Sequence, residues 1–258
     1  MTVSAYAPPR DALSKVRRRV TQMRRARPAR LAFEAPLLSI CFDDFPASAA
    51  ENGAAILERH GARGTFYAAA GLAGELGPSG VNFSGVDLQR LAKAGHEIGC
   101  HTYGHADCAR RDAFDTLKDL ARNREALAAL GYRGEVRSLA YPYGETRAAL
   151  KRALPPRFAS ARGVTPGLNS GAVDLAHLRA CPLYETTLPQ AHAWLKRAAK
   201  RKAWMIAYTH DVADPASLWG VRPENLDAFL RAARGAGVRI LPVTRVLIEA
   251  GLCPPSAS

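Results

Sequence analysis

The chain has 258 residues, 48% of them hydrophobic, and a formal net charge of +13. This size suits a single α/β domain with one sizeable core. The five cysteines are odd in number, scattered and without a C-x-x-C pair, which argues against a disulfide framework or a zinc ribbon and favours a reducing compartment. Because no apolar run approaches the roughly 18 residues of a membrane span, and no signal peptide follows the basic N-terminus, we expect a cytoplasmic protein.

The positive charge is concentrated at the N-terminus. Residues 1–30 contain nine Arg or Lys and one Asp, a net charge of +8, which leaves +5 for the remaining 228 residues. Apolar residues recur there at three- and four-residue steps, at Leu13, Val16, Val20 and Met23. With Asp11 as the N-cap and Pro28 as the stop, this pattern predicts a short basic amphipathic helix.

Three interpretations of this helix remain open. Its apolar stripe packs on the body of the protein, or residues 10–30 bind an anionic membrane surface, or they bind an acidic ligand. Nucleic acid is a weaker candidate, because the segment has no interleaved aromatic residues and the chain has no recognisable nucleic-acid-binding module. Membrane contact would place the protein peripherally at the inner face of the membrane.

Short apolar runs alternate with helical patterns along the rest of the chain. The strand candidates are 37–42, 65–69, 97–100, 137–140, 158–161, 178–181, 204–209 and 238–241, and the helix candidates lie near 48–60, 86–94, 112–130, 145–153, 189–201 and 224–236. A repeated strand–helix order predicts a parallel sheet, and this many units in so short a chain favour a closed or nearly closed barrel. No G-x-G-x-x-G or Walker loop supports a nucleotide fold. We divide the chain into an extension (1–30), one domain (31–252) and a tail (253–258).

Two adjacent acids, Asp43 and Asp44, follow the first core strand. Ser48 and Glu51 form an S-x-x-E pattern, which predicts that the next helix starts at Ser48 with a capping box, so the aspartates are not needed as caps. Because side chains alternate along a strand, neighbouring acids can converge only where the strand has ended and the chain turns. Pro46 favours such a turn. Converging carboxylates of this kind are held by a cation or share a proton.

Polar motifs follow three further strands. They are "CHTYGHADC" after the third strand, "AYPYGE" after the fourth and "YTHDVADP" after the seventh. Each is weak on its own, but in a parallel barrel the strand exits form the active face. The four exits therefore predict one site.

This combination resembles the NodB-type polysaccharide deacetylases, a family of carbohydrate esterases. The resemblance runs from about Leu37 to Leu247 and covers "FDDF", "GTFY", "GHEIGCHTYGH", "YPYG" and "YTHD" in the family's order. It implies a single-domain irregular (β/α) barrel of about seven parallel strands. It also implies removal of an acyl group, usually acetyl, from an amino sugar with a bound divalent metal.

The resemblance implies that Asp44, His101 and His105 are the metal ligands. Two imidazoles and one carboxylate suit Zn²⁺ and leave positions open for water and a substrate carbonyl, although other divalent metals are possible. We expect the two histidines to face one point because the chain turns helically after the strand. His96 lies before that strand, so we expect a structural role for it.

The remaining roles follow the same pattern. Asp43 is the candidate general base, as the first Asp of this motif is in the family, and His210 would protonate the leaving amine. The backbone N–H of Tyr143 can complete an oxyanion pocket, because Pro142 fixes the turn. Asp211, together with Pro142 and Arg162, is a candidate for substrate binding.

The chain departs from the family pattern in three places. Ala140 occupies the position where many members have an arginine that orients the base, Phe45 replaces the common glycine, and no Asp-Trp segment follows the fifth strand. The segment "SARGVTPGLN", which contains Arg162, stands there instead. Arg162 could orient Asp43, bind substrate or form a structural ion pair.

We therefore expect a metal-dependent hydrolase that removes an N-acetyl or other N-acyl group from an amino-sugar glycan, oligosaccharide or lipid-linked sugar precursor. One alternative is a related hydrolase that cleaves a sugar formamide or a small cyclic amide. The other is a non-catalytic basic protein that binds glycan or nucleic acid.

Overall fold

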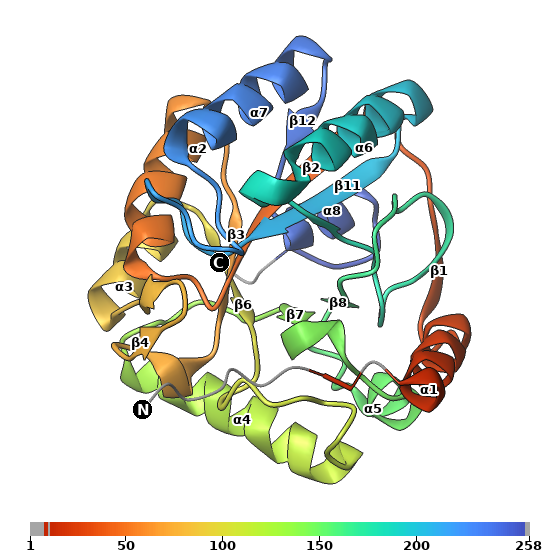
Figure 1. Ribbon diagram of the computed structural model, residues 1–258. Coiled ribbons are helices and arrows are strands. Elements are labelled where there is room, and N and C mark those ends of the chain that lie inside the picture. The colour runs from red at the N-terminus through yellow and green to blue at the C-terminus, as the bar shows by residue number, and fades with distance from the viewer. Residues whose placement is uncertain (1–7, 10, 256–258) are drawn as a thin grey trace.

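The computed structural model describes residues 8–9 and 11–255, and its centre is a curled sheet of parallel strands surrounded by helices (Figure 1). The strand order is β10 (Cys181–Pro182), β11 (Trp204–Thr209), β2 (Leu37–Asp43), β3 (Thr65–Ala68), β6 (Glu97–Cys100), β7 (Ser138–Ala140) and β8 (Ser160–Arg162). A further short strand, β12 (Arg239–Ile240), pairs in parallel with the first residues of β2. The predicted barrel of about seven parallel strands is confirmed.

The sheet closes through an irregular segment between its two edge strands. The N–H of Leu178 donates to the carbonyl of Ala161 in β8, and the N–H of Gly163 donates back to Leu178. Three residues further on, Cys181 of β10 pairs with Ala207 of β11. This short stretch therefore connects the last strand of the sheet to the first and explains why the barrel is irregular.

Helices cover the outside of the sheet. They are a π-helical turn (Ala49–Gly53) leading into α2 (Ala54–Arg59), then α3 (Gly85–Lys93), α4 (Ala113–Ala129), α5 (Ala148–Ala153), α6 (Leu188–Arg201), α7 (Pro223–Gly235) and α8 (Val243–Glu249). The sequence did not predict α8 or two small antiparallel pairs, β1 (Pro28–Leu31) with β9 (Gly171–Asp174) and β4 (Leu76–Gly77) with β5 (Gly80–Val81). Among the described residues, none of the helices has both the length and the apolarity needed to cross a bilayer.

Side chains of β2 alternate between two buried faces. Leu38, Ile40 and Phe42 belong to the cluster that packs against α2 and α7. Leu37 and Cys41 belong to the cluster on the other face, which contains residues of β11 and α8. A period of two therefore brings Asp43, the last residue of β2, to the same face as Cys41.

The predicted capping box does not form. Ser48 has helical backbone angles, and its side chain makes no capping hydrogen bond. The N–H groups of Ala49 and Ala50 donate instead to the carbonyl of Pro46. The first turn therefore begins before Ser48, and a serine already inside a helix cannot act as its N-cap.

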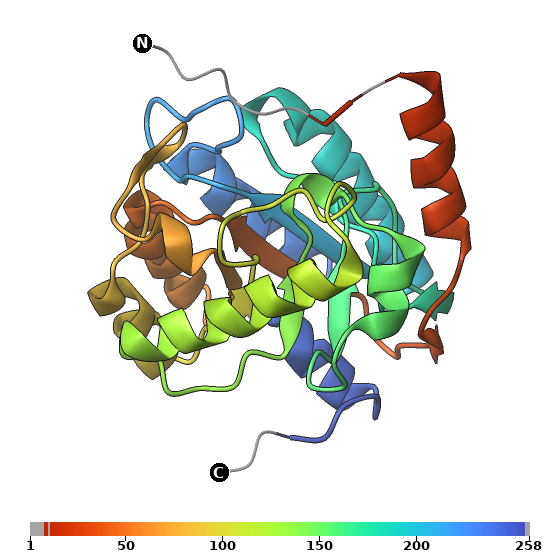
Figure 2. The ribbon, with the colours of Figure 1, turned by 90° about the horizontal axis from the view of Figure 1, so that it is seen from below.

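The predicted N-terminal helix is present as α1 (Ala12–Met23), with Asp11 as its N-cap. The Asp11 carboxylate accepts a hydrogen bond from the N–H of Ser14 at 2.9 Å. Figures 1 and 2 both place α1 at the outer edge of the molecule. Pro28 does not merely stop this helix, because it also begins β1, which pairs with β9.

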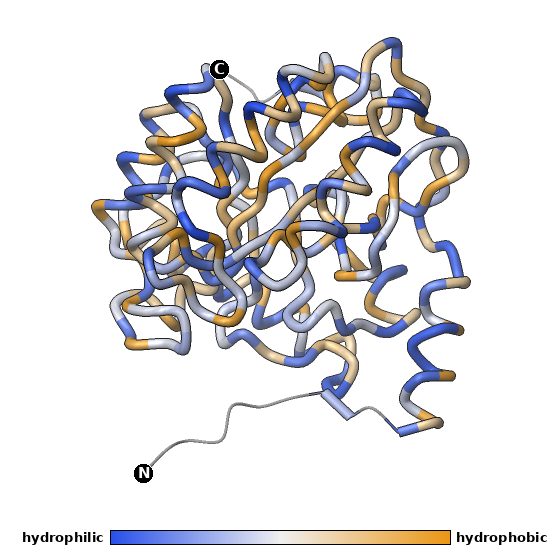
Figure 3. Tube along the Cα trace, turned by 45° about the horizontal axis from the view of Figure 1, so that its top comes forward, coloured by the Kyte–Doolittle hydropathy of each residue, from blue (hydrophilic) through white to orange (hydrophobic). Residues whose placement is uncertain are grey.

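Polar contacts, not the apolar stripe, attach α1 to the body. Arg18 pairs with Glu145 at 2.5 Å, and Gln22 donates to the hydroxyl of Thr165 at 2.9 Å. The stripe is exposed in the structure, with Leu13 59%, Val16 59%, Val20 42% and Met23 74% accessible, and Figure 3 shows its apolar positions alternating with hydrophilic ones along α1. The interpretation that the stripe packs on the body is therefore wrong.

Candidate active site

The strand ends bring the predicted site residues to one edge of the sheet. Asp43 pairs in register with Tyr67 of β3, and Ala140 of β7 pairs with Arg162 of β8. His101 directly follows β6 and His210 directly follows β11. Because all these strands are parallel, their carboxyl ends meet, as the polar motifs at the strand exits predicted.

Asp44, His101 and His105 form a compact cluster. One carboxylate oxygen of Asp44 lies 3.8 Å from His101 Nε2, and the other lies 3.3 Å from His105 Nε2. One ligand atom from each residue lies within 4.8 Å of the other two. Two imidazole nitrogens and one carboxylate at such separations can coordinate a divalent cation.

Hydrogen bonds to the other ring nitrogens orient both histidines. His101 Nδ1 lies 2.7 Å from the carbonyl of Ala140, so it carries the proton and leaves the Nε2 lone pair free. His105 Nδ1 lies 3.1 Å from the hydroxyl of Tyr143. Both Nε2 atoms therefore face Asp44. The residue at position 140 contributes its backbone, which an alanine supplies as well as an arginine.

Left-handed backbone conformations shape the site. Asp44, Thr102, His105 and Tyr143 have positive φ angles of 54°, 62°, 49° and 59°, and within the described residues only one other non-glycine residue does. Such conformations are costly and gather at functional sites. The expected helical turn between His101 and His105 is absent, since the chain bends there through positive-φ residues.

Burial keeps the two histidines neutral. It lowers the pKa of His101 to about 3 and that of His105 to about 4. A neutral imidazole has the lone pair that a metal requires. Burial also raises the pKa of Asp44 to about 7, with a further contribution from Asp43. One Asp44 oxygen is buried without a hydrogen-bond partner, so the cluster fits a cation, which would neutralise that carboxylate.

Asp43 has a different environment. Its side chain is buried and forms an ion pair with the guanidinium of Arg162, which is itself 1% exposed. Burial alone would raise the pKa of Asp43, but Arg162, with help from His101 and His210, holds it below its usual value. Asp43 therefore remains an ionised carboxylate next to the cation cluster without belonging to it.

Two tyrosines that the sequence analysis did not identify position Arg162. The guanidinium lies 4.7 Å from the ring centroid of Tyr67 and 5.1 Å from that of Tyr208. Cation–π contacts of this kind hold the guanidinium near the two aromatic rings and stabilise its charge. Both tyrosines lie on strands, and the only signal in the sequence was a large aromatic residue on a buried strand.

His210 follows β11, which lies on the opposite side of β2 from β8, the strand that ends in Arg162. The charge of His210 opposes the burial that raises the pKa of Asp44. Its ring is 6.0 Å from that of Tyr184 and 6.4 Å from that of Trp219, and its Nδ1 atom is buried with no hydrogen-bond partner. Trp219 is 37% exposed. The exposed indole next to His210 was missed, although it lies only nine positions further along the same loop.

The three residues predicted to bind substrate are buried. Arg162 is occupied by Asp43, and Pro142 is buried in the turn before Tyr143. Asp211, 2% exposed, accepts hydrogen bonds from the backbone N–H and the hydroxyl of Ser217. Asp211 thereby holds the loop that carries Trp219, and the assignment of the three residues to substrate binding stays a prediction.

His96 has the structural role that was expected. Its Nδ1 accepts from the N–H of Gly64 at 3.0 Å, and its Nε2 lies 3.0 Å from Glu58. It lies at the start of β6, at the opposite end from His101.

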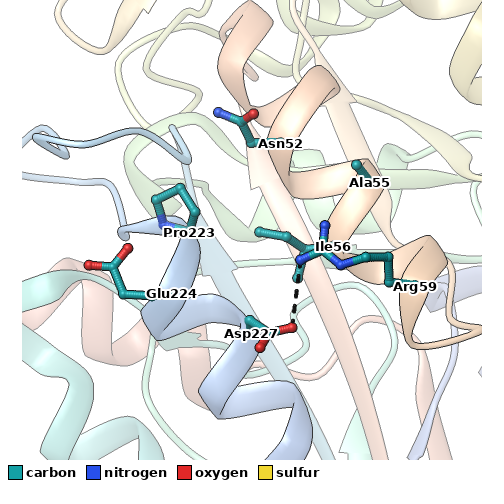
Figure 4. Close-up of a pocket in the computed structure, with 7 residues that line it drawn as sticks. All are labelled: Asn52, Ala55, Ile56, Arg59, Pro223, Glu224 and Asp227. Carbon is teal, nitrogen blue, oxygen red and sulfur yellow. Dashed lines mark ion pairs between the residues drawn. The ribbon is translucent and has the colours of Figure 1, made fainter.

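A small surface cavity of about 240 Å³ between α2 and α7 contains the Arg59–Asp227 ion pair and none of the strand-end residues (Figure 4).

Residues 31–155 match the family model described as polysaccharide deacetylase. This part of the chain, 125 of the 258 residues, is similar to the polysaccharide deacetylase family. The match includes both aspartates, both candidate histidine ligands and the Pro-Tyr-Gly turn. It identifies the enzyme class as a hydrolase acting on carbon–nitrogen bonds.

Solved structures share the fold at low sequence identity. A family 4 acetyl xylan esterase from Clostridium thermocellum, in complex with a cobalt ion, has a TM-score of 0.62 at 18% identity and covers 83% of this chain and 92% of its own. The Xyl-CE4 domain of a xylanase from the hindgut metagenome of Trinervitermes trinervoides has a TM-score of 0.61 at 16% identity, covering 86% and 94%. A peptidoglycan N-acetylglucosamine deacetylase has a TM-score of 0.58 at 16% identity, covering 83% and 89%. No curated protein matches significantly.

Proposed function

We propose that this protein is a metal-dependent hydrolase that removes an N-acyl group, foremost N-acetyl, from an amino sugar. The observation that carries the proposal is the arrangement of Asp44, His101 and His105 next to an ionised Asp43 that does not belong to the cluster. A ligand set with a separate base is what hydrolysis of an unactivated amide requires.

Asp44 and the Nε2 atoms of His101 and His105 would hold the cation, and Zn²⁺ suits this mixture of nitrogen and oxygen donors. When bound, the cation would polarise the acyl carbonyl and favour deprotonation of the attacking water. Three protein donors would leave coordination positions free for water and the substrate carbonyl.

Asp43 acts as the general base and accepts the proton of the attacking water. Its ion pair with Arg162 keeps it ionised near neutral pH, and the cation–π contacts of Arg162 keep that pair in place. In this interpretation Arg162 is a positioning residue that supplies what position 140, here an alanine, does not.

The backbone N–H of Tyr143 would donate to the oxyanion, and His210 would donate a proton to the leaving amine. The left-handed conformation of Tyr143 follows Pro142, which has no N–H of its own to compete. Trp219 next to His210 offers an exposed aromatic face, which we assign to the sugar ring.

We infer that the protein acts in the cytoplasm and that α1 attaches it to an anionic leaflet. The exposed stripe of Leu13, Val16, Val20 and Met23 lies on a helix that also carries six basic residues within or directly after it, Lys15, Arg17, Arg18, Arg19, Arg24 and Arg25. Apolar side chains would enter the interface while each nearby Lys or Arg contributes about 1 kcal/mol against anionic lipid. A bilayer with anionic headgroups complements both properties of this helix.

The test is a substrate panel for the metal-loaded protein. N-acetyl and N-formyl amino sugars, free, nucleotide-linked and lipid-linked, are incubated, and released acetate or formate is measured. The proposal predicts acetate release that stops on chelation and returns with Zn²⁺. Release of formate alone would favour a deformylase, and hydrolysis of O-acetyl xylan alone would favour an esterase. Purification without stoichiometric metal and no turnover would favour a non-catalytic binder.

A further inference from the structure

A cavity of about 740 Å³ lies between α1 and the loops next to the candidate active site. One wall is α1, and the other consists of residues 107–110 and 145–148. The α1 wall lies outside residues 31–155, which match the family model, and the loop wall lies inside them.

The two loops of this wall connect the cavity to the active site. Asp107 is two residues after the ligand His105, and Glu145 is two residues after Tyr143. The Tyr143 hydroxyl and His105 Nδ1 are 3.1 Å apart, so the residues that precede the two loops are in contact. A group bound in the cavity would therefore be close to a sugar bound at the metal cluster.

The cavity lining is strongly basic. Its charged residues are Arg17, Arg18, Arg24, Arg110 and Arg147 against Asp107 and Glu145, an excess of three positive charges. Arg18 is engaged with Glu145. Guanidinium groups bind phosphate through paired N–H donors, and several around one cavity favour an anion with several oxygens.

The α1 wall is fixed in position. Lys151, completely buried, donates from Nζ to the carbonyls of Thr21 at 2.8 Å and Arg24 at 2.7 Å, and forms an ion pair with Asp174 at 2.8 Å. The amide of Gln22 donates to Thr165. These contacts hold the last turn of α1 and its C-cap residue Arg24, so the helix has a defined place relative to the loops.

We propose that this cavity binds the phosphate or pyrophosphate group of an anionic amino-sugar substrate while the N-acyl group occupies the metal site. The inference rests on the proposed function and narrows its substrate class to a sugar attached to phosphate. Val16 and Val20 also line the cavity, so its wall combines cationic and apolar side chains. That combination favours a lipid attached to the phosphate over a nucleotide.

The experiment compares two double variants of the full chain. R17Q/R24Q removes two cavity charges, and R133Q/R201Q removes two charges from exposed positions outside both the cavity lining and the basic N-terminal segment. For each protein, kcat/KM is measured for an N-acetyl amino sugar linked to a phospholipid-type carrier, the same sugar linked to a nucleotide diphosphate, and the neutral sugar. Inorganic pyrophosphate binding is titrated in parallel.

R17Q/R24Q is expected to lower the ratio of kcat/KM for phosphorylated over neutral substrate at least tenfold and to weaken pyrophosphate binding to a similar extent, whereas R133Q/R201Q keeps both. A preference for the carrier-linked sugar over the nucleotide-linked sugar would identify the lipid as the source of the phosphate. An unchanged ratio, or an equal fall in both variants, would overturn the cavity assignment while leaving the deacetylase standing. If no N-acyl sugar is hydrolysed, the proposed function fails, and the pyrophosphate titration still decides whether the cavity binds the anion.

Discussion

Arg162 and Asp43 form a buried ion pair although they lie 119 positions apart in the chain. Asp43 ends β2, Arg162 ends β8, and between these strands in the sheet lie β3, β6 and β7. The curl of the sheet brings the two ends together across the interior. The position of the candidate base Asp43 therefore depends on how β8, which carries Arg162, is placed by the curl of the sheet.

Replacing Arg162 with Met should destabilise the protein. Removal of one partner of a buried pair leaves an uncompensated charge and costs about 3–5 kcal/mol of stability. The pKa of Asp43 lies below its usual value in the folded protein, so this stabilisation is present above the unfolded value near 4 and is lost as the pH falls through the folded pKa. In R162M the burial of Asp43 raises its pKa, so the variant also loses stability as the pH rises through that raised pKa. The loss relative to the parent should therefore be larger at pH 7 than at pH 4, as measured by denaturant unfolding at both.

The same variant should change the pH profile of hydrolysis. Without Arg162 the largest effect that opposes the burial of Asp43 is gone, so its pKa rises and the acid limb of kcat/KM moves to higher pH. Exposed Arg201, replaced by Met, serves as the control and should move neither limb. An acid limb that stays in place in R162M would show that Arg162 does not tune the base.

The division between ligand and base predicts different effects for the adjacent aspartates. Asp44→Asn and His101→Ala should lose most of the bound metal, because each removes a donor from the three-residue cluster. Asp43→Asn should retain metal and lose turnover by a factor on the order of 10²–10⁴, the contribution of a general base. Metal content by mass spectrometry and initial rates decide the point. Equal metal loss in the two Asn variants would contradict the assignment.

His210 can be tested by the leaving group. An amine needs a proton to depart, whereas 4-nitrophenolate does not, so His210→Gln should slow N-acetyl sugar hydrolysis about 10²-fold or more and slow 4-nitrophenyl acetate hydrolysis far less. Both rates are measured on the metal-loaded protein. Equal slowing of both substrates would assign His210 to binding or to the fold.

Much of this site could be predicted from residue types and strand periodicity. The polar motifs at the strand exits identified the ligands, because a parallel sheet collects its carboxyl ends at one edge. The role of Arg162 could not be selected from three options, since the choice depends on how the sheet curls over 119 intervening positions. The positive φ angles of Thr102 and His105 were also hidden, because a non-glycine residue gives no local signal of a left-handed turn.

Two predictions about helices, the capping box at Ser48 and the packing of the α1 apolar stripe, failed because local sequence does not show the partners of a helix elsewhere in the fold. A capping motif reports a local preference. Ser48 lies inside the helix because the N–H groups of Ala49 and Ala50 donate to the carbonyl of Pro46, so the first turn begins before Ser48. In α1, periodicity identified the helix and its N-cap correctly but did not reveal which face would be buried. Polar partners far along the chain, Glu145 and Thr165, decided that question.

Lys151 should control the attachment of α1. Lys151→Met removes the donor to the carbonyls of Thr21 in α1 and of its C-cap Arg24, and leaves Asp174 without its cation in a mostly buried position. Burial raises the pKa of Asp174, but Lys151 and neighbouring backbone N–H groups lower it below its usual value. The stability contributed by this carboxylate is therefore present above pH 4 and disappears as the pH falls through its folded pKa.

We expect K151M to be less stable than the parent by about 3–5 kcal/mol at pH 7 and by less at pH 3.5. Hydrogen exchange should show faster opening of α1 than of β2. Exposed Lys196→Met on α6 is the control and should change neither quantity by much. Unaltered exchange in α1 would mean that the other polar contacts suffice to hold it.

We expect α1 to attach the protein to anionic membranes, and the structure shows which residues should be changed to test this. Deleting residues 1–30 would remove most of β1 together with α1 and would uncover β9, so lost binding could reflect damage to the fold. Leu13 and Met23 are better targets, because they are exposed and do not line the cavity. Burial of one such side chain contributes about 1.5–3 kcal/mol, so L13S/M23S should bind anionic vesicles at least tenfold more weakly.

Vesicle sedimentation with and without anionic lipid, at low and high salt, measures this effect. The matched control is V86S on α3, which removes an equally exposed apolar side chain far from the basic segment and should leave binding unchanged. Melting temperatures of both variants should stay near that of the parent, because neither change disturbs a buried contact. Vesicle binding by L13S/M23S equal to that of V86S would show that α1 does not insert, and binding insensitive to salt would show that its arginines do not attract the protein to the surface.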